Sequence, residues 1–180
     1  MLKKGDVVFT RGNGWLQRLI RWGETSPGES RTLVNHALLV VSDGPAPDVR
    51  IVEAEAKVQA GRFGALHAGD WFTAYRAKDM DAADADAICA AALAHVGESY
   101  GWGQLFLQLI DSKVLGGAYG ARRLAHVDPK EICSRLVATA YAVRGFHFDL
   151  DDGAAEDPDS MLDYCVAHPE LYAFVECGTL

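Results

Sequence analysis

Two apolar runs on either side of a turn-rich segment decide how this chain folds: HALLVV at residues 36–41 and RIVEAEA at residues 50–56. Both runs are rich in Val, Ile and Leu, as short strands commonly are. The segment between them, SDGPAPDV at residues 42–49, contains the Gly, Pro and Asp that are typical of turns. We therefore predict two neighbouring antiparallel strands, the first of which begins at His36.

Further strands and helices are predicted on either side of this pair. Short apolar runs indicate strands at residues 7–9, 71–76 and 173–177. Apolar residues at helical spacing, an acidic first turn or a closing glycine indicate helices at residues 15–22, 81–96, 102–110, 132–141 and 160–166, with Gly145 as a C-cap and a long loop at 111–126. Strands precede most of the helices, so the order predicts an α+β fold rather than alternating βαβ units.

Composition narrows the class of protein. The 180 residues suit one domain, 1–180, and the balance of 49% hydrophobic to 23% charged residues is typical of a globular protein. The net charge of −8 disfavours nucleic acid and anionic membranes as partners. The first apolar run is too short for a secretory signal, and no segment reaches the ~20 apolar residues of a membrane span. We therefore expect a cytoplasmic protein without stable membrane insertion.

The four cysteines, Cys89, Cys133, Cys165 and Cys177, do not form a metal-binding pattern. CxxC, HxxxH and HExxH patterns are all missing, which disfavours a zinc site on spacing. Disulfides are also not expected in a chain of this length without a recognisable secretory signal. We predict free thiols, with no metal and no cofactor.

Cys133 is the cysteine whose position suggests a reactive thiol. It lies near the start of an apolar-faced helix, where unpaired N–H groups and the helix dipole favour a thiolate. The alternative is a small core residue. The preceding DPKE, residues 128–131, resembles a capping signature that would place Cys133 a full turn inside the helix. We expect the helix to begin closer to Ile132, with residues 128–130 forming a turn.

His36 and the acidic residues of the next strand are candidates to assist a thiol. His36 opens its strand as either a hydrogen-bonded polar group at the sheet edge or a base presented to a cleft. Glu53 and Glu55 share one face of the following strand. They are either solvated side chains of an outer face or the carboxylates that orient an imidazole.

Several short motifs in this chain order resemble the YiiX/YaeF-type branch of the NlpC superfamily. These are GDVVF at 5–9, NHA at 35–37, IVEA at 51–54 and CSxLV at 133–137, together with GxxY at 97–100 and DPxS at 157–160. The resemblance implies a circularly permuted papain-like fold, with an antiparallel sheet or partial barrel packed against helices. It also implies Cys133 as the nucleophile, His36 as the base and Glu53 as the third polar residue. Asn35 and Arg135 depart from the family, which often has Ser and an acidic residue there.

The resemblance implies a cysteine hydrolase that cleaves amide bonds in peptides or cell-wall peptides through a thioester. The backbone N–H of Cys133 is one expected oxyanion donor, and Tyr100 is a candidate substrate-binding residue and second donor, or else a half-buried aromatic residue. An acyltransferase or lipid-directed thiol enzyme acting on an acyl-bearing substrate is the first alternative, and an inactive binding module is the second. Four aromatic residues would line an apolar cleft for acyl groups or simply pack in the core: Trp15, Trp22, Trp102 and Phe106.

Overall fold

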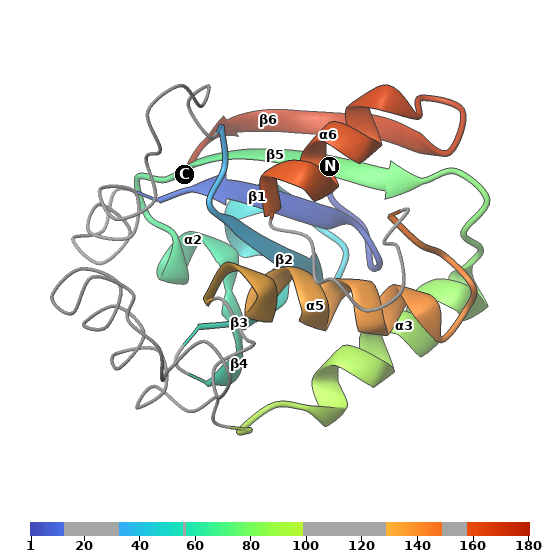
Figure 1. The fold of residues 1–180 in the computed structure, drawn as a ribbon. Coiled ribbons are helices and arrows are strands. Elements are labelled where there is room, and N and C mark those ends of the chain that lie inside the picture. Colours follow the sequence, from blue (N-terminus) through green and yellow to red (C-terminus); the bar gives the residue numbers. More distant parts are fainter. Residues whose placement is uncertain (13–32, 56, 99–128, 149–157) are drawn as a thin grey trace, which may run out of the picture.

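One antiparallel sheet organises the molecule (Figure 1). The computed structural model describes residues 1–12, 33–55, 57–98, 129–148 and 158–180. Within these residues, six strands pair in the order β4-β3-β2-β1-β5-β6, and every pairing is antiparallel. The strands are β1 (Val7–Arg11), β2 (His36–Val40), β3 (Arg50–Ala54), β4 (Val58–Arg62), β5 (Trp71–Ala77) and β6 (Tyr172–Thr179).

Helices lie on both faces of the sheet. The α-helices of the described segments are α2 (Phe63–Leu66), α3 (Ala82–Ala94), α5 (Pro129–Ala142) and α6 (Pro158–Ala167), with a 3-10 helix η1 (Ala46–Asp48). Helix α5 packs against β2 and β3 and also contacts α3 and α6 (Figure 1). No helix in these segments has both the length and the apolar character that a membrane span requires.

The alternation of side chains along the strands creates two cores, one on each face of the sheet. Leu39 points to the face that also buries Val137 of α5, whereas Leu38 belongs to the opposite core with Phe63 of α2. Both leucines are fully buried. The sheet is therefore buried on both faces, which explains why the HALLV segment of β2 is apolar at nearly every position.

Buried polar contacts fix the turn before β1. Asp6 is fully buried, and its carboxylate accepts hydrogen bonds from the Arg76 side chain at 2.7 and 2.8 Å and from the Lys3 backbone N–H at 2.8 Å. The hydroxyl of Tyr141 on α5 donates to the carbonyl of Gly5. Burial raises the pKa of Tyr141 well above its usual value, so this hydroxyl remains a donor. These contacts join β1 to β5 and to α5.

Most of the predicted elements are confirmed in the described segments. β1, β2, β3, β5 and β6 lie where strands were predicted, and β2 and β3 pair as expected. Helix α3 begins after Asp81, whose side chain forms a capping box with Asp84. β4 and α2 were not predicted, because residues 57–66 have no clear apolar period. The predicted helices at 15–22 and 102–110 and the loop at 111–126 lie outside the described residues.

The predicted start of the cysteine-bearing helix was wrong. Helix α5 begins at Pro129 rather than near Ile132. A proline is well suited to the first helical position, because its missing N–H is not needed there and its φ is already helical. The DPKE signature therefore marks the true start of the helix, and Cys133 lies in its second turn.

Candidate active site

His36 is the first residue of β2 and is nearly enclosed, with 6% of its surface exposed. Its strand pairs with β1, where Thr10 lies opposite it. Its ring is thus attached at the end of a rigid, doubly paired strand, which limits the positions it can adopt.

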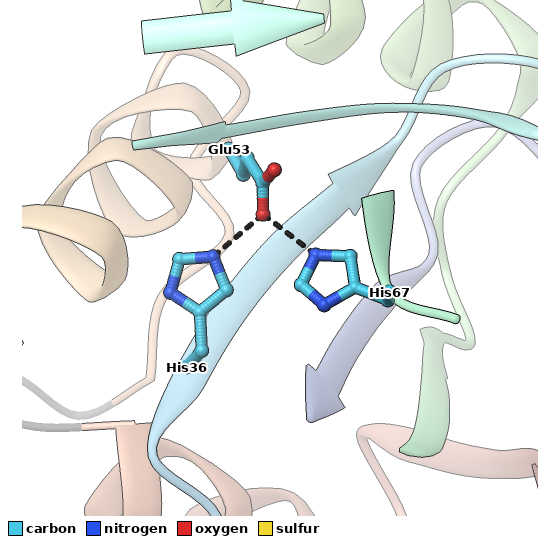
Figure 2. Close-up of side chains that lie close together, drawn as sticks. All are labelled: His36, Glu53 and His67. Carbon is cyan, nitrogen blue, oxygen red and sulfur yellow. Dashed lines mark hydrogen bonds and ion pairs between the residues drawn. The ribbon is translucent and has the colours of Figure 1, made fainter. Parts of the chain in front are cut away.

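Glu53 of β3 holds the His36 ring. β2 and β3 pair with Leu38 opposite Glu53, so His36 is a diagonal neighbour of the carboxylate. His36 Nε2 lies 2.7 Å from Glu53 Oε2 (Figure 2). Only 1% of Glu53 is exposed, whereas Glu55 lies beyond the end of β3 and is exposed. Of the two candidates, the structure therefore places Glu53 at the histidine.

The buried hydrogen bond shifts both groups toward their charged forms. Burial alone raises the pKa of Glu53, but its hydrogen bonds and charge interactions with His36 and His67 outweigh burial and lower that pKa. Burial alone lowers the pKa of His36. The charge of Cys133 and hydrogen bonds with Cys133 and Glu53 outweigh it, so the pKa of His36 is raised well above its usual value.

Cys133 enters this environment from α5. The cysteine is 3% exposed on a helix that packs directly against β2 and β3. Its effects on the pKa of His36 include a side-chain hydrogen bond, so the two side chains are neighbours. Glu53 binds Nε2 of the ring, which leaves Nδ1, the nitrogen on the other side, for this contact.

The helix start changes the expected role of the Cys133 backbone. In a regular α-helix that begins at Pro129, the N–H of Cys133 lies beyond the first turn, where N–H groups have helical partners. This start disfavours the predicted role of the N–H as an oxyanion donor, which stays a prediction.

A second histidine, His67, was not predicted as part of the site. It follows α2 and is 3% exposed. His67 Nε2 lies 2.8 Å from the same Oε2 of Glu53, and Nδ1 lies 3.1 Å from Oδ2 of Asp70. Both nitrogens of the His67 ring therefore face a carboxylate oxygen. His67 belongs to no recognisable sequence motif, and the helix that positions it, α2, was not predicted from the sequence.

The two imidazole rings flank the carboxylate. The centroids of His36 and His67 are 5.8 Å apart, with planes inclined by 26°. Figure 2 shows each ring directing one nitrogen at the same Glu53 oxygen. The other oxygen, Oε1, accepts from Gln59 of β4 at 2.9 Å. Glu53 is therefore held by three side chains from three different segments.

The same arrangement brings together potential metal ligands. One ligand atom each from His36, Glu53 and His67 lies within 4.8 Å of the other two. Local spacing patterns in the sequence disfavour a metal site. These three residues come from β2, β3 and the segment after α2, a combination that no local pattern could indicate.

The remaining cysteines occupy different environments. All four cysteines lie within the described residues, and none of them forms a disulfide. Cys89 is buried and donates to the carbonyl of Val40 at 3.5 Å, and burial raises its pKa. Burial also raises the pKa of Cys165, whereas Cys177 on β6 is exposed. Tyr100 and the aromatic residues Trp15, Trp22, Trp102 and Phe106 lie outside the described residues.

Comparison with known proteins gave no family for the chain. No protein-family model matches it, and no curated protein matches its sequence. The class of protein is therefore inferred from the fold and the site.

Proposed function

We propose that the chain is a cysteine hydrolase that cleaves an amide bond, with Cys133 as nucleophile, His36 as base and Glu53 as the group that orients the base. The observation that supports this most directly is the buried hydrogen bond of 2.7 Å between His36 and Glu53, with Cys133 as a further partner of the same ring. A nucleophile, a base and a group that orients the base are what such catalysis needs.

The proposed reaction begins with the sulfur of Cys133 as a thiolate and His36 as an imidazolium. Sulfur attacks the carbonyl carbon of the substrate, and the resulting oxyanion collapses as the C–N bond breaks. His36 gives its Nδ1 proton to the departing amine, which leaves a thioester on Cys133. Water then attacks the thioester, His36 accepts a proton from that water, and the acid product leaves with the thiol restored. Throughout the cycle Glu53 stabilises the imidazolium and keeps Nδ1 directed at the sulfur.

The proposed fold is the circularly permuted papain-like arrangement that the sequence motifs resemble. A histidine-bearing strand precedes a cysteine-bearing helix along the chain, and that helix packs on the histidine strand. The antiparallel sheet with α3, α5 and α6 packed on one face is compatible with this fold. We accordingly propose peptides or cell-wall peptides as the substrate class. An acyl-bearing substrate would share the first chemical step and differ in the leaving group and the acceptor.

Covalent labelling with two matched electrophiles tests the proposal. A peptidyl chloromethyl ketone and a fatty-acyl chloromethyl ketone are incubated with the protein, and the modified cysteine is located by mass spectrometry. Cys133→Ala is the test variant and Cys177→Ala is the control, because Cys177 is exposed on β6 and reacts through accessibility alone. We expect peptidyl labelling of Cys133 to be fast and to slow at least about tenfold in His36→Gln.

Each outcome separates the candidate functions. Faster labelling by the fatty-acyl reagent would indicate the acyl-directed enzyme. Slow labelling of Cys133 by both reagents, unchanged in His36→Gln, would indicate a binding module and refute the hydrolase. With a cleavable peptide substrate, Cys133→Ala is expected to lower kcat about a thousandfold or more and to leave the fold intact by circular dichroism.

A further inference from the structure

We propose that His36, Glu53 and His67 form a binding site for a divalent transition-metal ion, best matched by zinc, and that the bound ion switches off the thiol chemistry. The binding itself stands on the geometry of these three side chains. The inhibitory effect rests on the function proposed above, so the two are tested separately.

The donor atoms converge from three rigid segments. His36 Nε2 and His67 Nε2 lie 2.7 and 2.8 Å from Glu53 Oε2, and the ligand atoms all lie within 4.8 Å of one another. A tetrahedral zinc ion with bonds of about 2.0–2.1 Å holds its donors about 3.3 Å apart. The two nitrogen–oxygen distances are about half an ångström shorter than this spacing, and the bound of 4.8 Å covers the two nitrogens, so small side-chain shifts would accommodate the ion.

The surrounding contacts are those that metal ligands need. The second nitrogen of a metal-bound histidine usually donates to a carboxylate, which fixes the ring. His67 has this partner in Asp70, 3.1 Å from its Nδ1. Ligating carboxylates are commonly hydrogen-bonded in turn, and Gln59 supplies that bond to Glu53 at 2.9 Å. The three ligands are thus oriented by groups outside the set.

Ligand chemistry favours zinc over magnesium or calcium. Two imidazole nitrogens and one carboxylate oxygen form the same three-ligand set that catalytic zinc uses in some hydrolases, with a fourth position left to a water molecule. Magnesium and calcium prefer oxygen donors. All three side chains are at least nine-tenths buried, which limits competition from bulk water for these positions.

Metal binding would change how the base is held. The atom of His36 that would bind the ion, Nε2, is the atom that Glu53 now holds at 2.7 Å. The ion would therefore replace the Glu53 contact that orients the His36 ring toward Cys133, and it would occupy the carboxylate at the same time.

Zinc titration of Cys133→Ala protein tests binding without any contribution from the thiol. Binding is measured by competition with a chromogenic zinc chelator and by native mass spectrometry. We expect one zinc ion per chain, with affinity reduced at least tenfold in His67→Gln and in Asp70→Asn. His95→Gln is the control, because His95 is exposed and its ring bonds to Glu98 rather than to any of the three proposed ligands. Circular dichroism shows that each variant is folded before its affinity is compared.

X-ray absorption of the zinc-loaded wild-type chain gives the donor set directly. We expect nitrogen and oxygen donors at about 2.0–2.1 Å and no sulfur at about 2.3 Å. A sulfur donor, failure of Cys133→Ala to bind zinc, or equal affinity in His67→Gln and His95→Gln would overturn the site.

The inhibitory effect is read from Cys133 labelling in the wild-type chain. One equivalent of zinc should slow labelling at least tenfold, EDTA should restore it, and His67→Gln should resist the ion. Labelling that proceeds at full rate with zinc bound would refute inhibition while leaving the binding site intact. Slow labelling in EDTA would instead count against the hydrolase.

Discussion

Replacing Glu53 by Gln tests the buried network more sharply than any other single change. The substitution keeps the shape of the side chain and removes its charge. Only 1% of the Glu53 surface is exposed, and its carboxylate accepts hydrogen bonds from His36, His67 and Gln59. The new amide cannot accept at both ends, so either an imidazole or Gln59 loses its partner.

The expected loss of stability follows from these contacts. Removing one member of a buried ion pair costs about 3–5 kcal/mol, because a charge is left uncompensated. The Gln carbonyl still accepts a hydrogen bond and the imidazoles can release protons, so we expect about 2–4 kcal/mol at pH 7. For a chain of this size that loss corresponds to a melting temperature lower by roughly 5–15 °C. Urea unfolding followed by circular dichroism measures the difference.

The difference in the free energy of unfolding between wild type and Glu53→Gln should become smaller as the pH falls. The pKa of Glu53 is lower in the folded chain than its ordinary value of 4.5. Its contribution is therefore fully present above pH 4.5 and declines as the pH falls, when the unfolded chain gains a proton that the folded chain does not. Glu53→Gln lacks this contribution, so the gap between variant and wild type should narrow between about pH 5 and pH 3.

Glu55→Gln is the matched control. It makes the same chemical change two residues away, at an exposed position, and should alter stability by less than about 0.5 kcal/mol. Equal stability of the two variants at pH 7, or a gap that stays constant down to pH 3, would refute the reasoning.

Two further predictions concern the frame of the sheet. Asp6→Asn should lower the free energy of unfolding by about 2–4 kcal/mol, because Asp6 is fully buried against the Arg76 guanidinium. Asp86→Asn is the control, because it removes only an exposed ion pair with Lys4 and should cost much less. Urea unfolding measures both losses, and equal losses would contradict the prediction. Gly5→Ala should cost at least about 1 kcal/mol more than Gly69→Ala in thermal unfolding. The two glycines have nearly equal positive φ values, +83° for Gly5 and +84° for Gly69, so the backbone strain of an alanine is the same at both. A Cβ at Gly5 would lie 2.4 Å from the sulfur of Met80, whereas a Cβ at Gly69 meets nothing within 4 Å. Equal melting temperatures of the two variants would show that the clash at Gly5 is relieved.

The paired strands β2 and β3 could be predicted because their signals are local. An apolar run, a turn rich in Pro and Gly, and a second apolar run specify an antiparallel pair without reference to the rest of the chain. That pairing also brought Glu53 within reach of His36, which is why the contact between them was foreseeable. By contrast, β4 includes the polar residues Gln59 and Arg62, and its place at the sheet edge comes from its pairing with β3.

His67 could not be predicted because its role is decided by tertiary packing. Its ring reaches Glu53 only because the chain turns through α2 beneath β3, and Phe63 packs against it with ring centroids 5.4 Å apart. The helix start at Pro129 differs from this case, because the local DPKE signature at residues 128–131 already indicates it. A start near Ile132 is favoured only by a catalytic role of Cys133, which needs the helix dipole close to the sulfur. The capping signature was therefore the better guide to the helix boundary.

The place of Cys133 on α5 also has a consequence for synthesis of the protein. Residues 36, 53 and 67 leave the ribosome well before residue 133, so a nascent chain that ends before Pro129 holds both histidines and the glutamate without the sulfur. Such a chain lacks the proposed nucleophile of the site, so under the proposed function it could not cleave its own peptide bonds or those of neighbouring polypeptides there. Translation of α5 would then be the step after which the proposed thiol chemistry at this location can first occur.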